Sequence, residues 1–190
     1  QKLKAGECHV AAYPKPADVA GLKSDKRLQV MMQPGFNLGY ITYNVKKPQL
    51  AKLEVRQALD MSVNKKAIID AVYQGSGQLA TNPMPPTEWS YNKNIKDAPY
   101  DVAKAKQLLA KAGYPNGEGF PTIEIWFREE GGYNGAILPP AAQYLQAQFK
   151  DILGITMNIK VMPGKDWMEG MLARKNNIYL SPYAYDYLDP

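Results

Sequence analysis

Two segments of the chain hold the side chains best suited to chemistry, because each places aromatic rings beside charges. Residues 126–135 read WFREEGGYNG, with one cation and two adjacent carboxylates ahead of two glycines. Residues 183–190 read YAYDYLDP, with three tyrosines around Asp186. A carboxylate accepts charge-assisted hydrogen bonds from an amine, and tyrosine rings can add cation–π attraction. These residue types suit the capture of an amine-bearing ligand.

Catalysis is the competing interpretation, with Glu129 and Glu130 as the acid and base of an acidic-loop hydrolase. Adjacent residues of a strand point to opposite faces, so these two carboxylates are poorly placed to flank one bond. His9 is the single histidine, which leaves no Ser/His/Asp arrangement. We therefore assign no catalytic residue. Two plainer alternatives stay open: an exposed charged turn in the first segment, and a strand-edge core around a solvated Asp186 in a module without a small ligand.

Strands that alternate with helices must position both segments. Apolar periodicity and caps predict strands at 28–32, 36–44, 122–127, 155–161 and 178–181, and helices at 18–22, 53–63, 65–74, 102–112, 141–153 and 165–175. Such alternation is typical of an α/β fold with a mixed sheet flanked by helices. Both chemically loaded segments lie at the ends of predicted strands, where α/β folds carry ligand contacts.

The run at 55–86 combines two amphipathic helices with a proline-rich exit. Its first apolar stripe recurs every fourth residue and consists of Val55, Leu59 and Val63. Asn64 is a good N-cap for the second helix, and Gly75 is a left-handed stop. Two glycines and three prolines between 75 and 86 then predict a long loop with a fixed course. An ordinary helical hairpin would show the same pattern.

The individual residues of this run match one known family. They are Arg56-Gln57-Ala58-Leu59, Asn64-Lys65, Ala67-Ile68, Gly75, Gly77 and Pro85-Pro86, followed by YDVAKAKQLLAKAGY at 100–114. The chain thereby resembles the extracytoplasmic solute-binding proteins of peptide-importing ABC transporters, the dipeptide- and oligopeptide-binding family. The resemblance implies a lobe of a two-lobed periplasmic-binding-protein (Venus-flytrap) fold. Residues 1–35 would be the tail of the first lobe and the crossover, and 36–190 most of the second lobe, truncated at its C-terminal side, as expected of a fragment.

The resemblance also implies a function and a site. Such proteins capture di- or oligopeptides by lobe closure and deliver them to an ABC permease, without catalysis or a cofactor. Asp186 matches the carboxylate that receives the α-ammonium group of the peptide. The other residues expected at the substrate are Tyr183, Ala184, Tyr185, Trp126, Arg128, Tyr133 and Asn134.

One position departs from the dipeptide pattern. Dipeptide-binding members place an arginine just before the pair that matches Tyr133-Asn134, where it clamps the peptide carboxylate, but this chain has Gly131-Gly132. Arg128 lies a few residues upstream and is the nearest substitute. Peptide length is therefore open, and so is a non-peptide ligand such as an oligosaccharide, haem or a metal complex.

Cys8 is the single cysteine, so no disulfide can close within the sequence. The resemblance pairs it with a cysteine near the mature N-terminus, outside these residues. His9 stands beside it, but a closed metal site needs three or four converging donors, and we expect none. The resemblance further implies a monomer that is periplasmic, or anchored to the membrane on the extracellular side.

Composition excludes several other classes of protein. With 190 residues, 45% hydrophobic and 22% charged, the chain has an ordinary globular composition. Its net charge of +5 comes from basic residues that are spread along the chain, and no nucleic-acid motif accompanies them. No stretch approaches the roughly 20 apolar residues of a membrane span. We expect neither a nucleic-acid partner nor a transmembrane helix.

Overall fold

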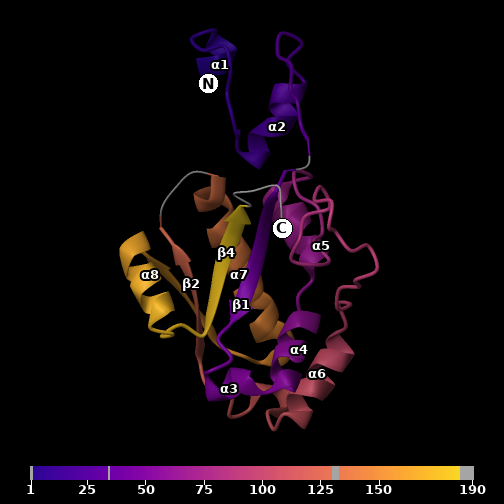
Figure 1. The fold of residues 1–190 in the computed structure, drawn as a ribbon, viewed down its shortest axis with the longest axis vertical. Coiled ribbons are helices and arrows are strands. Elements are labelled where there is room, and N and C mark those ends of the chain that lie inside the picture. Colours follow the sequence, from indigo (N-terminus) through magenta and orange to yellow (C-terminus); the bar gives the residue numbers. More distant parts are fainter. Residues whose placement is uncertain (1, 34, 130–132, 185–190) are drawn as a thin grey trace.

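One mixed sheet of four strands organises the chain (Figure 1). The computed structural model describes residues 2–33, 35–129 and 133–184. The strands are β1 (Asn37–Tyr43), β2 (Ile123–Arg128), β3 (Met157–Met162) and β4 (Ile178–Ala184), in the spatial order β1-β4-β2-β3. β1 pairs antiparallel with β4, whereas β2 runs parallel to both of its neighbours. The predicted α/β fold with a mixed sheet is confirmed.

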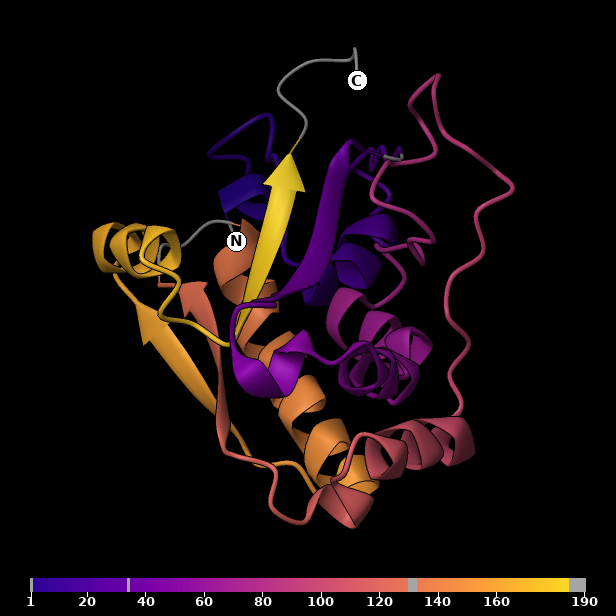
Figure 2. The ribbon, with the colours of Figure 1, turned by 60° about the horizontal axis from the view of Figure 1, so that its bottom comes forward.

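Helices cover both faces of this sheet (Figures 1 and 2). They are α3 (Pro48–Ala51), α4 (Leu53–Met61), α5 (Lys65–Ile68), η1 (Ile69–Tyr73), α6 (Val102–Lys111), η2 (Pro115–Gly117), α7 (Tyr133–Leu153) and α8 (Gly164–Leu172). The long helix α7 packs on one face, with α4 and α6 beside it, and α8 covers the other face of β2. None of the described helices combines the length and apolar character needed to cross a bilayer.

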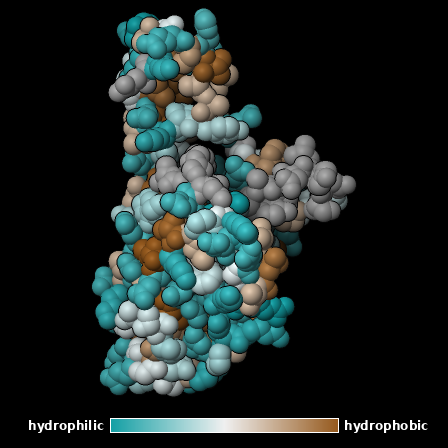
Figure 3. Space-filling view, turned by 90° about the vertical axis from the view of Figure 1, so that its left-hand side faces the viewer, coloured by the Kyte–Doolittle hydropathy of each residue, from teal (hydrophilic) through white to brown (hydrophobic). Residues whose placement is uncertain are grey.

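Alternation along β2 separates the two faces, as its sequence predicts. Ile123, Ile125 and Phe127 are buried in the main core, while Glu124 and Trp126 point to the side of α8. On the face that α4, α6 and α7 cover, side chains such as Leu59, Leu109 and Phe149 complete this core. The exterior on the α8 side of the molecule is largely hydrophilic (Figure 3).

Arg56 of α4 forms hydrogen bonds with the preceding helix, α3. Its guanidinium Nη1 donates to the carbonyls of Leu50 and Ala51, each at 2.8 Å, and so caps the end of α3. Val55 and Leu59 of α4 are fully buried. Arg56 therefore stabilises the end of α3, while Val55 and Leu59 pack α4 against the core.

The next junction is held by Asn64 and Lys65. Asn64 Oδ1 accepts from the amide of Ala67 at 3.0 Å, which confirms the predicted N-cap. Lys65 Nζ lies 2.8 Å from the Asp97 carboxylate and 3.5 Å from Asp60. The ammonium group thereby ties the return of the long loop to the start of α5.

The helix after Asn64 differs from the prediction of one regular α-helix. It widens to a π-helix at Ile69, and the left-handed stop begins one residue early, at Gln74 (φ 46°), before Gly75 (φ 83°). The loop at 74–101 then contains neither helix nor strand among its described residues. Its course is set internally, for example by the 2.8 Å hydrogen bond between the Thr81 and Tyr91 hydroxyls, as the predicted fixed loop requires.

The N-terminal arm contains α1 (Lys2–Ala5) and α2 (Pro16–Lys23) and lies beyond one end of the sheet (Figure 1). The strand predicted at 28–32 is wrong, because residues 28–32 form no ladder. A strand needs a partner for its backbone hydrogen bonds, and the described sheet does not reach this arm.

The helix predicted at 141–153 is too short, because α7 already begins at Tyr133 and contains Pro139 and Pro140.

Candidate functional site

The candidate site is the edge of the sheet at which β2 and β4 end. These strands are parallel, so their carboxyl ends lie at the same edge, where open α/β sheets place ligands. Arg128 is the last residue of β2, and Tyr183 and Ala184 are the last residues of β4. The backbone of Tyr183 pairs with Leu38 of β1, which fixes the exit of β4. Two segments far apart in the sequence thus meet at one edge.

A third segment reaches this edge through α7. Tyr133 and Asn134 are its first two residues, and four residues separate them from the end of β2. The structure therefore brings the backbones of the predicted residues from three segments to one region. Tyr185 and Asp186 lie outside the described residues, and so do Glu130, Gly131 and Gly132. The ligand contacts predicted for Tyr185 and Asp186 stay predictions.

Arg128 is exposed and is oriented by an aromatic ring of α8. Its guanidinium carbon lies 5.5 Å from the ring centroid of Trp167, within the range of cation–π attraction. Trp167 is itself held edge-on against Tyr179 of β4, with centroids 5.8 Å apart. Beyond Arg128, the amide of Glu129 donates to Met162 at 2.8 Å. An aromatic support thus holds a cation at the end of β2.

Trp126 is buried between β2 and α8. Only 5% of it is exposed, and its indole N–H donates to Glu124 Oε2 at 2.7 Å. Lys160 Nζ lies 4.6 Å from the ring centroid, and α8 packs against the ring at Gly170. A Cβ at Gly170 would lie 2.5 Å from Trp126 Cζ3. The environment of Trp126 is that of a packing residue beneath α8, and its predicted ligand contact stays untested.

Sequence reasoning missed the residues that support this edge, namely Lys160, Trp167 and Gly170. A signal for two of them was present, since Trp167 and Gly170 are three residues apart in a predicted helix and therefore share one face. The wide Trp and the absent Cβ on that face indicate close packing against a large neighbour. That the neighbour is Trp126 follows only from the pairing of β2 with β4.

Residues named for the catalytic and metal-binding alternatives lie in different parts of the chain. Glu129 is exposed, and Glu130 lies outside the described residues. No group of three or more His, Cys, Asp or Glu side chains converges among the described residues. Cys8 is half-buried and unpaired in the described chain.

Comparison with known proteins gives one family. The model of the bacterial extracellular solute-binding proteins, family 5 Middle, matches residues 1–190. Di/tripeptide-binding protein 1 of Pseudomonas aeruginosa (strain UCBPP-PA14) is 66% identical over 126 residues, which cover 66% of this chain and 23% of that protein. Heme-binding protein A of Haemophilus influenzae is 55% identical over 127 residues, or 67% of this chain and 23% of that protein.

The fold is equally close to solved structures. The periplasmic binding protein DppA from Helicobacter pylori, in complex with the peptide STSA, superposes with a TM-score of 0.85 at 29% identity. That match covers 100% of this chain and 35% of the DppA chain. The chain therefore spans about a third of the length of a structure that it resembles throughout.

Proposed function

This chain belongs to family 5 of the bacterial extracellular solute-binding proteins, and from that membership we propose that the full-length protein captures peptides and delivers them to an ABC permease. The observation that carries the proposal is the shared edge of β2 and β4, at which Arg128 and the backbone of Tyr183 lie. The names of relatives add support, because one binds di- and tripeptides and a structural neighbour holds the peptide STSA.

Within this proposal, Asp186 receives the α-ammonium group of the peptide, with Tyr183, Ala184 and Tyr185 beside it. An ammonium and a carboxylate at about 4 Å attract by on the order of 4 kcal/mol at an effective dielectric constant of about 20. Desolvation opposes this gain when the site closes. Hydrogen bonds to charged groups are also shorter and stronger than neutral ones, so the pair would set the direction of the peptide.

Arg128 is the cation that we assign to the opposite, carboxylate end of the peptide, with Tyr133 and Asn134 nearby. Its support by Trp167 at 5.5 Å restricts the guanidinium, which lowers the entropy lost on binding. Trp126 would act indirectly, by holding α8 and hence Trp167 in place through the close contact at Gly170.

The N-terminal arm fits a contribution to a first lobe. Residues 2–33 lie mostly beyond the end of the sheet (Figure 1), and several of their large apolar side chains are exposed. They include Val10 at 82%, Tyr13 at 81% and Met31 at 83%. Such side chains gain free energy when another apolar surface covers them. Residues 36–190 then form most of the second lobe, and hinge closure between the lobes encloses the ligand.

Haem capture is the second candidate, and the relative named heme-binding protein A favours it. The two candidates differ in what they need from the site. A peptide requires opposite charges at both ends of an extended backbone, whereas haem requires a wide apolar slot. The aromatic and charged segments at both strand ends, together with the identity to a di/tripeptide-binding protein, favour the peptide.

The test uses the full-length protein, purified from its own compartment, and identifies small molecules released on denaturation by mass spectrometry. We expect peptides, and we expect Asp186→Ala to weaken their binding by at least about tenfold, as the loss of a charged hydrogen-bond partner implies. Asp166→Ala on α8, where Asp166 is exposed, is the matched control and should bind normally. Haem absorbance without bound peptide, or hydrolysis of added peptides, would contradict the proposal.

The proposal also places the protein outside the cytoplasm, free or anchored to the membrane, as a monomer that contacts the permease. Fractionation of cells and size-exclusion chromatography of the full-length protein check these two statements. A protein that remains in the cytoplasmic fraction could not present its ligand to an importer.

A further inference from the structure

A cavity of about 340 Å³ opens at the other end of the sheet, where β1 ends and β4 begins. The turn after β1, the end of α8 and the start of β4 form its walls. Val45, Met171 and Tyr179 contribute apolar and aromatic surface, while Lys46, Arg174 and Asn176 contribute polar groups. A volume of this size lies at the lower end of the range for small-molecule sites, about 300–1,000 Å³.

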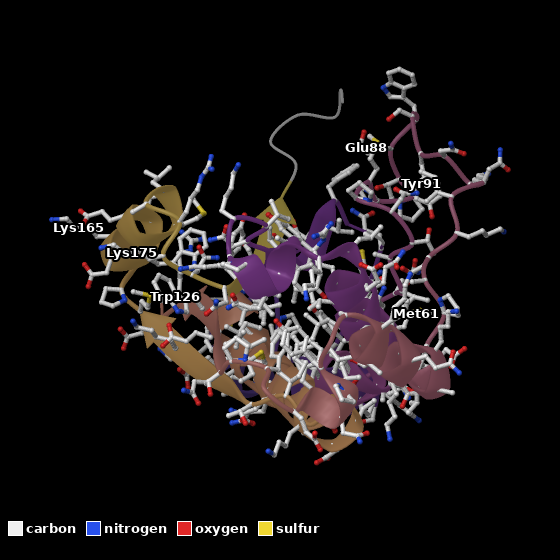
Figure 4. All side chains as sticks on the ribbon, turned by 90° about the horizontal axis from the view of Figure 1, so that it is seen from below. Met61, Glu88, Tyr91, Trp126, Lys165 and Lys175 are labelled. Carbon is white, nitrogen blue, oxygen red and sulfur yellow. The ribbon has the colours of Figure 1, made fainter. Side chains whose placement is uncertain are left out.

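Two cations that are far apart in the sequence, Lys46 and Arg174, line this cavity. Each is followed in the chain by a lysine, Lys47 and Lys175, so that two basic pairs lie in these turns. Figure 4 looks onto this end of the molecule and shows Lys175 beside α8. Within the described part of the chain, none of the four forms a salt bridge. The cavity lining includes no carboxylate. The lining therefore carries two positive charges and no negative one.

Asn44 builds this arrangement by joining the two turns. Its side-chain nitrogen donates to the carbonyls of Arg174 at 3.0 Å and Asn176 at 2.8 Å. Its Oδ1 accepts from the amide of Lys46 at 3.1 Å, and its own amide donates to Asn177 at 2.9 Å. The two basic pairs are thus held together by a hydrogen-bonded scaffold and not by chance proximity of long side chains.

Two residues in the lining carry features that packing alone does not require. Asn176 is 3% exposed, yet its Nδ2 has no hydrogen-bond partner among the described residues. Arg174 adopts a left-handed backbone (φ 54°) just after α8, a position at which glycine is usual. A buried donor without an acceptor, and strain at a charged residue, are both found at binding sites more often than elsewhere.

We infer that this cavity is a second binding site, separate from the peptide edge, which takes a small organic anion. The ligand carries a carboxylate or phosphate that meets Lys46 and Arg174, and a short apolar body that lies against Met171 and Tyr179. The inference does not depend on peptide capture, because none of the residues predicted to contact the peptide lines this cavity. Tyr179 is the one link between the two regions, since it lines the cavity and packs against Trp167.

Calorimetry on the full-length protein tests the inference, with succinate and inorganic phosphate as probes and uncharged succinamide as the control ligand. We expect saturable binding of both anions and none of succinamide. Arg174→Gly and Lys46→Gln should each weaken anion binding by about tenfold, since each removes a charged donor. Arg174→Gly also relieves the left-handed backbone strain, and thermal unfolding of this variant checks that a loss of binding does not come from a loss of stability. Peptide binding should be unchanged in both variants.

Lys150→Gln on α7 is the matched control, because it removes an equal charge from an exposed position outside the cavity. Three results would overturn the inference: no saturable binding of either anion, equal weakening by Lys150→Gln, or binding to vesicles of phosphatidylglycerol without binding of the free anions. The last result would mean that the basic residues meet a lipid surface and that the cavity is not a small-molecule site.

Discussion

The two ends of the sheet are built in different ways. At the end where β1 stops and β4 starts, Asn44 makes four hydrogen bonds, three of which join the two turns, while the fourth, from the Lys46 amide, lies within one turn. At the end where β2 and β4 stop, Arg128 is exposed at the last position of its strand and rests on Trp167 of α8. The first end is organised by hydrogen bonds between one side chain and backbone groups, and the second by side-chain packing. We therefore expect Asn44 at the first end to matter mainly for stability, and Arg128 at the second end to matter mainly for peptide binding.

Asn44→Ala should have the largest effect on stability. It removes three side-chain hydrogen bonds, so we expect the free energy of unfolding to fall by about 3 kcal/mol, at roughly 1 kcal/mol for each bond. Urea unfolding of the full-length protein, followed by tryptophan fluorescence, measures this loss. Asn158→Ala on the exposed side of β3 is the control. Equal stability of the two variants would show that Asn44 does not organise this end.

Gly170→Ala should have the next largest effect. The added methyl group would lie 2.5 Å from Trp126 Cζ3, so α8 or the indole must shift, at a cost of about 1–3 kcal/mol. Gly21→Ala in α2 is a matched control, because its nearest neighbour is 3.8 Å away and alanine favours a helix. If Gly170→Ala also weakens peptide binding, the support of Arg128 by α8 is confirmed. If Gly170→Ala is as stable as the parent protein, α8 does not pack closely against Trp126.

Arg174→Gly should stabilise the protein by about 1 kcal/mol, because glycine adopts the left-handed conformation without the steric cost that other residues carry. Thermal unfolding of the full-length protein measures the gain. Arg174→Ala keeps the left-handed strain and should show no such gain. A decrease for Arg174→Gly would mean that the arginine side chain stabilises this end by more than the strain costs.

Arg128→Ala should have the smallest effect on stability, about 0.5–1 kcal/mol for an exposed cation–π contact, and a larger effect on peptide capture. Titration of the full-length protein with a peptide and with its C-terminal amide separates the two roles. Loss of the preference for the free carboxylate supports the assignment of Arg128. If the variant still prefers the free carboxylate over the amide, a cation other than Arg128 binds the carboxylate.

Much of the fold follows from local patterns. The strand at 122–127, the helix at 102–112 and the cap at Asn64 were all predicted. The second of these begins at a local cap, since Asp101 Oδ1 accepts from the Lys104 amide at 2.9 Å. The strand at 28–32 was not formed, because strand formation depends on a neighbouring strand that a local pattern does not contain. The start of α7 was missed as well. Pro139 and Pro140 indicate a break, but the helix continues through them.

The sequence by itself determined the kind of protein, through residues whose roles are local or shared by the family: Arg56 that caps α3, Asn64 that caps α5, and glycines that end helices. Those roles depend on neighbours a few residues away, so a linear pattern carries them. Only the tertiary structure decided that Trp126 is enclosed under α8, that Trp167 orients Arg128, and that two distant basic pairs meet around Asn44. These contacts depend on strand order and register, because the side chains that meet are brought together by β1, β2 and β4 and not by their spacing in the chain.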